Sequence, residues 1–126
     1  NIRMSKKILI IEDDLFLQGL EVTKLKKDGY EIETAVNSVE AFKILEKTKP
    51  DMILLDLLLP EVDGFMILEK IRENKDMVTI PVIVFSNLSE DKDIKRAQKL
   101  GISEFMIKSN FTLDELTKKI KELIGA

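Results

Sequence analysis

Four short apolar segments of this sequence are each followed at once by residues that could do chemistry. Together these residues bring three or four carboxylates, one hydroxyl and one ammonium group. The segments and their trailing polar residues are 8–11 with Glu12, Asp13 and Asp14, 52–55 with Asp56, 82–85 with Ser86 and Asn87, and 105–107 with Lys108 and Ser109. If the segments end at one place in the fold, these groups form an acidic pocket that contains one cationic side chain.

Carboxylates gathered in this way repel one another, and burying them without compensation is costly. Mg2+ relieves the repulsion, because it prefers oxygen ligands and typically takes one or two carboxylates plus phosphate oxygens. With Lys108 and one such cation, the charges of Glu12, Asp13 and Asp56 are balanced, so the pocket can admit a phosphoryl group. An ionised Asp is also a covalent nucleophile, and phosphoryl transfer asks mainly for positioning and charge neutralisation. We expect one of Asp13 and Asp14 merely to cap the following helix.

The composition excludes most other chemistry. The chain has no Cys and no His, which rules out disulfides, thiol catalysis, imidazole bases and most zinc sites. Its 126 residues suffice for one domain, and 44% hydrophobic with 34% charged residues is a globular balance. The net charge of -3 offers no basic surplus to nucleic acid or an anionic membrane surface. No apolar run approaches the roughly 20 residues of a membrane span, and no signal peptide is evident, so we expect a cytoplasmic protein.

The four apolar segments predict β-strands, because each is too short for an independent helix and is bounded by polar residues, Pro or Gly. Near-continuous apolar runs are typical of strands covered on both faces, as in a parallel sheet. A fifth segment, residues 30–35, alternates between apolar and charged residues, which suits an edge strand. Helical spacing predicts five helices, over residues 15–27, 38–48, 63–74, 91–100 and 113–124. The predicted capping residues are Asp14, Ser38, Thr112 with Glu115 as a capping box, Gly29 and Gly101.

Five repeats of strand then helix predict an α/β protein with a flavodoxin-like (βα)5 fold. Its doubly wound, five-stranded parallel sheet has the expected strand order 2-1-3-4-5. Ligands of such sheets bind beyond the carboxyl ends of the strands where the chain order reverses, here between the first and third strands. The predicted acidic pocket lies at that point.

The four motifs, in this order and at these spacings, resemble those of response-regulator receiver domains of two-component signal transduction, the CheY-like family. The matching motifs are residues 7–14, 51–60 running on to 63–64, 81–86 and 105–108. The resemblance covers residues 6–124, and we expect residues 6–126 to form the receiver domain. Residues 1–5 are interpreted as an N-terminal extension, with the hypothesis that Asn1 to Arg3, ahead of the first Met, are left over from cloning.

The resemblance implies a phosphoacceptor and a metal site. Asp56 corresponds to the aspartate that is phosphorylated. Asp13 and Asp56 are expected to bind Mg2+ directly, Glu12 through water, and Leu58 through its backbone carbonyl. Lys108 corresponds to the lysine that pairs with the phosphoryl oxygens.

The resemblance also implies a switch. Ser86 corresponds to the hydroxyl residue that moves toward the phosphoryl group, and Phe105 to the aromatic residue that rotates in response. The implied phosphoryl donor is a phosphohistidine on a sensor histidine kinase or a phosphotransfer protein, which agrees with the absence of His here. The implied readout surface comprises the fourth helix, fifth strand and fifth helix, which would control an output protein or domain and pair into a homodimer. Such a domain assists its own phosphorylation and dephosphorylation but is not a conventional enzyme, and it contacts neither nucleic acid nor membrane directly.

Three departures from the family pattern stand at the site. Lys108 is followed by Ser109 where the family usually has Pro, commonly in cis, so we expect a trans and looser loop. Asn87 replaces the usual Ala or Gly. Leu58 and Leu88 stand where many relatives carry polar residues. Our hypothesis is that these two side chains hinder the attacking water and lengthen the phosphorylated lifetime.

Three other functions compete with this one. A flavin- or nucleotide-binding module of the same fold would need a Ser/Thr/Gly-rich phosphate loop where Glu12, Asp13 and Asp14 stand. A phosphatase of the haloacid dehalogenase type needs a second Asp two residues after the first, where Leu58 stands. A pseudo-receiver, folded but never phosphorylated, stays open as an alternative, although the full set of site residues argues against it.

Overall fold

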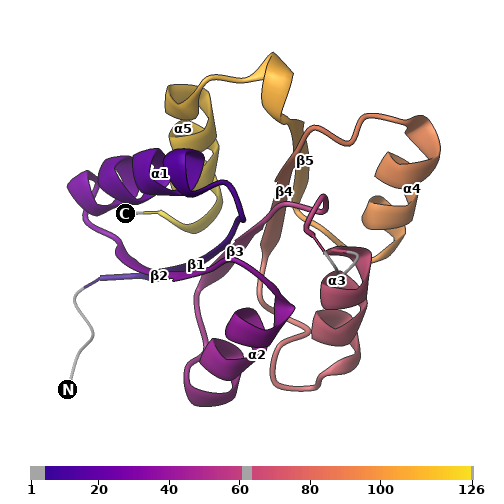
Figure 1. Cartoon of the computed structure of the whole chain (residues 1–126). Helices are drawn as coiled ribbons and strands as arrows, with labels where there is room; N and C mark the ends of the chain where they lie inside the picture. The colour runs from indigo at the N-terminus through magenta and orange to yellow at the C-terminus, as the bar shows by residue number, and fades with distance from the viewer. Residues whose placement is uncertain (1–4, 61–63, 126) are drawn as a thin grey trace.

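Five parallel strands form one sheet that carries helices on both faces (Figure 1). The structure is a computed structural model that describes residues 5–60 and 64–125. The strands pair in the order β2-β1-β3-β4-β5, which confirms the predicted flavodoxin-like topology. They are β1 (Lys7–Ile11), β2 (Glu31–Ala35), β3 (Met52–Leu55), β4 (Val82–Ser86) and β5 (Glu104–Ile107).

The helices also follow the predicted order. They are α1 (Leu15–Lys27), α2 (Ser38–Lys47), α3 (Gly64–Glu73), α4 (Asp91–Lys99) and α5 (Leu113–Ile124), with a short 3-10 helix η1 (Lys108–Asn110). α1 and α5 have the predicted bounds. The predicted helix start at Asp63 and residues 1–4 of the predicted extension lie outside the described residues. No helix within the described residues is long and apolar enough to span a membrane.

The sheet separates two apolar layers because its strands present aliphatic side chains on both faces. Leu9 and Ile11 of β1 pack with buried residues of α2, α3 and α4, whereas Ile8 and Ile10 pack with buried residues of α1 and α5. Figure 1 shows the same division, with α1 and α5 on one side of the sheet. Burial on both faces explains why the inner strands are continuous apolar runs, and β2 is the edge strand that its alternating pattern predicts.

The helix caps are as predicted at Asp14 and at Thr112 with Glu115, but not at α2. Asn37, rather than Ser38, caps α2: its side chain accepts the N–H of Glu40 at 2.9 Å. A cap needs an extended backbone, and Asn37 has φ -156° and ψ 177°, whereas Ser38 is already helical and buried. Both residues have short polar side chains, so the sequence alone does not distinguish them.

Candidate functional site

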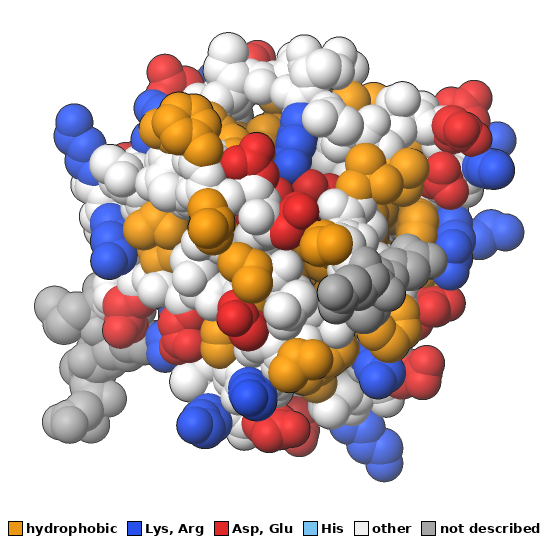
Figure 2. Space-filling view, in the orientation of Figure 1, with side chains coloured by type: hydrophobic (Ala, Val, Ile, Leu, Met, Phe, Trp, Pro, Cys, Tyr) orange, Lys and Arg blue, Asp and Glu red, His pale blue; other side chains and the backbone are white. Residues whose placement is uncertain are grey.

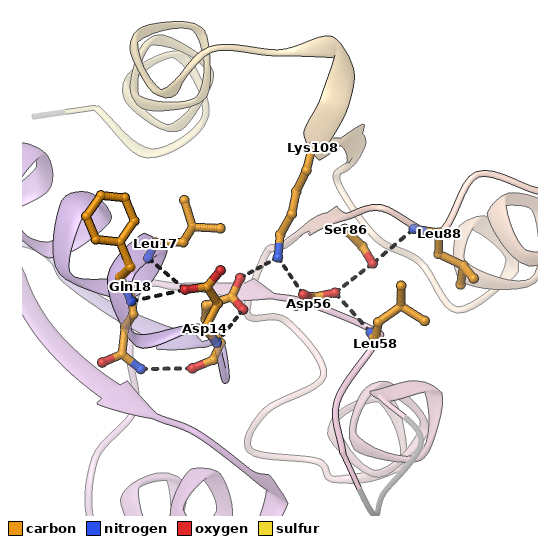
Figure 3. A network of polar contacts seen from close by, with 10 residues as sticks. Asp14, Leu17, Gln18, Asp56, Leu58, Ser86, Leu88 and Lys108 are labelled. Carbon is orange, nitrogen blue, oxygen red and sulfur yellow. Dashed lines mark hydrogen bonds and ion pairs between the residues drawn. The ribbon is translucent and has the colours of Figure 1, made fainter.

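The carboxyl ends of β1, β3, β4 and β5 bring Glu12, Asp56, Ser86 and Lys108 together, as predicted (Figure 3). Lys108 bridges two carboxylates, since its Nζ lies 2.7 Å from Glu12 Oε1 and 2.6 Å from Asp56 Oδ2. The parallel register explains the meeting: the N–H of Asp56 donates to the carbonyl of Ile11, so β1 and β3 end side by side. The acidic pocket therefore exists in the fold.

Asp56 is the centre of the hydrogen bonds in this pocket and is 5% exposed. Its Oδ1 accepts the Ser86 hydroxyl at 2.6 Å and the N–H of Leu58 at 2.9 Å, while Oδ2 accepts Lys108. Ser86 and Lys108 therefore already contact the carboxylate before any phosphoryl group is added, and the expected movement of Ser86 toward a phosphoryl group stays a prediction. A buried carboxylate requires donors, and these side chains already supply them.

Glu12 is even less exposed than Asp56, at 2%. Burial raises the pKa of Glu12 and the charge of Asp56 adds to the rise, although Lys108 and the N–H of Asp14 stabilise the charged form. Burial by itself would lower the pKa of Lys108, but its hydrogen bonds and charge interactions with Asp56 and Glu12 outweigh burial and raise it. The ammonium therefore stays charged between the two acids. The side-chain amide of Gln18 donates to the carbonyl oxygen of Glu12 at 2.9 Å and fixes the end of β1.

Asp14 is the member of the acidic run that caps α1. Its Oδ1 accepts the N–H groups of Phe16 and Leu17 at 3.0 and 3.1 Å. Asp13 lies on the exposed side of the pocket, and carboxylate oxygens of Glu12, Asp13 and Asp56 lie within 4.8 Å of one another. Asp14 is therefore the expected capping residue, and Asp13 is the residue that remains in the pocket.

The three clustered carboxylates fit a hard divalent cation. All the donors are oxygens, which suits Mg2+, and two of them are buried while Asp13 opens to solvent. Mg2+ usually keeps several waters, so a half-open cluster suits it better than a closed cage. The role of the Leu58 carbonyl as a further ligand stays a prediction.

Leu58 and Leu88, the two apolar residues at positions where many relatives carry polar residues, flank the pocket and differ in exposure. The side chain of Leu58 is 50% exposed, whereas Leu88 is partly buried and its N–H lies 3.3 Å from Ser86 Oγ. Asn87 is exposed.

Phe105 is half-buried on β5 and packs against the apolar layer of α2, α3 and α4. Phe105 therefore lies on the α4 side of the sheet, as a switch residue would need.

The loop after β5 is trans and regular. No cis peptide bond occurs within residues 5–60 and 64–125, so the predicted trans bond before Ser109 is confirmed. Instead of the looser segment expected there, the chain folds into the 3-10 helix η1.

The sequence did not identify two polar residues of the site region. Gln18 holds the end of β1, and Glu21 is 2% exposed in α1. Glu21 stands four residues from Leu17 and from Leu25, and this spacing is the signal that places it on the buried face of the helix. Burial, followed by the charge of Glu12, raises the pKa of Glu21 to about 8.

Comparison with known proteins agrees with this geometry. A family model described as the response regulator receiver domain matches residues 8–121. The transcriptional regulatory protein KdpE of Staphylococcus aureus is 41% identical over 118 residues, covering 94% of this chain and 49% of that protein. The chain thus spans about half the length of the curated relatives it matches.

Solved structures with similar folds include two response regulators. The phosphorylated cyanobacterial phytochrome response regulator RcpA is 30% identical with a TM-score of 0.85, over 95% of this chain and 94% of that one. The Mn(2+)-bound form of response regulator Rcp1 is 28% identical with a TM-score of 0.81, over 94% of this chain and 91% of that one. With the family model covering nearly its whole length, this chain belongs to the response-regulator receiver domains of two-component systems.

Proposed function

We propose that this chain is a phosphorylation-activated receiver that accepts a phosphoryl group on Asp56 from a phosphohistidine of a sensor histidine kinase or phosphotransfer protein. The observation that carries the proposal is the arrangement around Asp56. Its buried carboxylate lies between the Lys108 ammonium and the Ser86 hydroxyl, beside a cluster of acids that can hold a cation. The arrangement supports positioning and charge neutralisation, which phosphoryl transfer chiefly requires.

In the proposed step, one carboxylate oxygen of Asp56 forms a bond to phosphorus while the phosphorus–nitrogen bond of the donor breaks. The bonding electrons pass to the imidazole nitrogen, so this chain needs no base of its own. Lys108 lies 2.6 Å from the acceptor carboxylate and is placed to pair with the added phosphoryl oxygens.

Glu12, Asp13, Asp56 and the carbonyl of Leu58 are the proposed metal-binding groups. When bound, Mg2+ would neutralise charge on the entering phosphoryl group. The support from this chain is the set of three carboxylates within 4.8 Å of one another, which repel without a cation. The manganese bound by Rcp1 is consistent with a divalent cation in this family.

Exposed apolar side chains around the pocket support a protein donor. Leu15 and Phe16 are 67% and 78% exposed at the start of α1, and Leu58 is half-exposed on the other side of the acids. Figure 2 shows hydrophobic side chains around the acidic and basic atoms at the centre of this face. A histidine-bearing helical surface could bury these side chains as it approaches Asp56, whereas a small phosphate ester would leave them in water. We place the encounter in the cytoplasm.

The proposed readout surface comprises α4, β5 and α5. A groove of about 250 Å³ lies between α4 and β5, and its lining includes Ile94, Ile102 and Phe105. A change of the Phe105 side chain would alter this groove, and so change how α4 and β5 meet an output protein or a second copy of the chain. Ser86 and Phe105 lie on adjacent strands two residues apart in register, because Val84 of β4 pairs with Phe105 of β5 and Ser86 pairs with Ile107.

Incubation with Mg2+ and acetyl phosphate, followed by intact-mass measurement, tests the phosphoacceptor. We expect the mass of one phosphoryl group on the wild type and on the exposed-site control Asp76→Asn, and no gain on Asp56→Asn. A gain on Asp56→Asn would place the acceptor elsewhere. No gain on the wild type, with fold and metal binding intact, would make the chain a pseudo-receiver.

A further inference from the structure

A buried acid of α1 takes no part in the proposed phosphoryl transfer. Glu21 is 2% exposed and lies one helical turn from Leu17 and one from Leu25. Both leucines belong to the apolar layer that α1 and α5 form against β1 and β3. Glu21 therefore places a carboxyl group where its neighbours along the helix place aliphatic side chains.

The carboxyl group of Glu21 is poorly compensated. Its Oε1 is buried and has no hydrogen-bond partner among the described residues. An ionised carboxylate without donors is costly in such surroundings, so the neutral acid is the form that the packing favours. Among the elements of this layer, β2 contributes Ile32 and α5 contributes Leu113, Leu116 and Ile120, none of which carries charge.

The charged groups that act on Glu21 belong to the acidic pocket or stand directly beside it. Glu12 from β1, Asp56 from β3 and Asp14 from the start of α1 oppose its ionisation, and Lys108 from the end of β5 favours it. An ion pair between α1 and α5, Lys24 with Asp114, lies at the exposed surface. With burial as the largest cause, the pKa of Glu21 is raised to about 8, so most copies carry a proton at neutral pH.

We propose that Glu21 releases its proton when a divalent cation enters the acidic pocket, so that metal occupancy of the receiver site increases as the solution becomes mildly alkaline. The inference rests on the proposed function, because the pocket is the Mg2+ site of that proposal. A bound cation cancels the repulsion that Glu12 and Asp56 exert on Glu21 and adds attraction of its own. The coupling is reciprocal, because an ionised Glu21 adds one negative charge near the pocket and strengthens cation binding by the same factor.

Calorimetric titration with Mg2+ alone, in buffers of different ionisation enthalpy, tests this coupling. For the wild type we expect release of about half a proton per ion near neutral pH, and affinity that rises about tenfold between about pH 6.5 and about pH 9. For Glu21→Gln we expect loss of most of the proton release and a change in affinity below about twofold over that range. The exposed control Glu31→Gln should behave as the wild type. The Glu21→Gln variant is needed to assign the proton release to Glu21, because Glu12 also has a raised pKa.

The outcomes separate the two proposals. If the wild type binds no Mg2+, the metal site of the proposed function fails. If it binds Mg2+ without a pH slope, or if Glu21→Gln keeps the full slope, the coupling through Glu21 is wrong and the metal site stands. The carboxyl carbon-13 resonance of Glu21 in the wild type gives a second measurement that needs no substitution. Its titration midpoint should fall when Mg2+ is added, and an unmoved midpoint would overturn the inference.

Discussion

The Ser86 hydroxyl donates to Asp56 Oδ1 across 2.6 Å and joins the ends of β4 and β3. The same oxygen accepts the N–H of Leu58, and the other oxygen accepts Lys108, so one carboxylate gathers donors from three strand ends. An acyl-phosphate bond from this carboxylate to phosphorus would consume one of these acceptor oxygens and add three new ones. At least one of the three donors must then change partners. Ser86 is the donor that lies within β4, so a change of its partner acts directly on that strand. The proposed switch therefore begins as an exchange of hydrogen bonds that already exist.

Replacing Ser86 by Ala should separate phosphorylation from switching. Asp56 and Lys108 are untouched, so we expect Ser86→Ala still to gain one phosphoryl group from acetyl phosphate. Without the hydroxyl, the phosphorylated state loses one differential contact, and amide chemical-shift changes in α4 and β5 should fall by about half or more. NMR spectra recorded before and after phosphorylation measure this, with the exposed Ser89→Ala as the control. Full-sized shift changes in Ser86→Ala would show that the hydroxyl does not drive the switch.

Replacing Lys108 by Met should destabilise the fold in a pH-dependent way. The variant leaves Glu12 and Asp56 buried beside each other without the ammonium that lies 2.7 and 2.6 Å from them. Near neutral pH we expect the free energy of unfolding to fall by about 3 kcal/mol, the scale for breaking a buried ion pair. The exchange of Lys108 for Met otherwise costs little, because Met keeps most of the aliphatic stem of the lysine.

The sign of the pH dependence of Lys108→Met is set by the acids. Glu12 has a raised pKa in the fold, so it takes up a proton more readily there than in the unfolded chain, and removing Lys108 increases that tendency. The deficit of the variant should therefore shrink as the pH falls through the range in which the carboxyls become neutral. Urea unfolding at several pH values measures it, with Lys95→Met on exposed α4 as the control. A deficit that stays constant down to about pH 4 would contradict the role of Lys108 as counter-charge.

The fold and most of the pocket could be predicted because the relevant signals are local. Apolar runs bounded by Pro, Gly or acids identify the inner strands, and residues just after those strands must lie at one edge of a parallel sheet. Glu21 could not be assigned so easily, since a charged residue on a helix usually faces water, and only its distance of four residues from Leu17 and Leu25 suggests otherwise. The partners of Asp56 also depend on side-chain packing, which strand order does not fix.

Gly64 should be intolerant of a side chain because of the loop that comes after β3. A Cβ built on Gly64 would lie 2.5 Å from the Cα of Leu57 and 2.7 Å from its carbonyl oxygen, both backbone atoms that cannot rotate away. We expect Gly64→Ala to lower the free energy of unfolding by about 1–3 kcal/mol through overpacking. The shift of Leu57 should also displace the N–H of Leu58 from Asp56 and slow phosphorylation.

Gly19 provides a matched control for the Gly64 prediction. It lies within α1, and a Cβ there meets nothing within 4 Å. Gly19→Ala should therefore stabilise the chain by up to about 1 kcal/mol, since Ala favours a helix interior more than Gly does. Thermal unfolding of both variants checks the opposite signs, and equal effects would mean that close approach to Leu57 is not the cause at Gly64.

Leu58 should lengthen the life of the aspartyl phosphate by keeping water from it. The N–H of Leu58 donates to Asp56, the proposed phosphoacceptor, and its side chain is half-exposed beside that carboxylate. Leu88 adds a second apolar group next to Ser86. An amide at position 58 could hold a water near the phosphorus, and lowering the barrier by about 1.4 kcal/mol would raise the hydrolysis rate about tenfold. We therefore expect Leu58→Asn to lose its phosphoryl group about tenfold faster than the wild type, and the exposed Val39→Asn in α2 to lose it at the wild-type rate. Intact-mass time courses after removal of acetyl phosphate measure both rates, and an unchanged rate in Leu58→Asn would show that this side chain does not limit access of water.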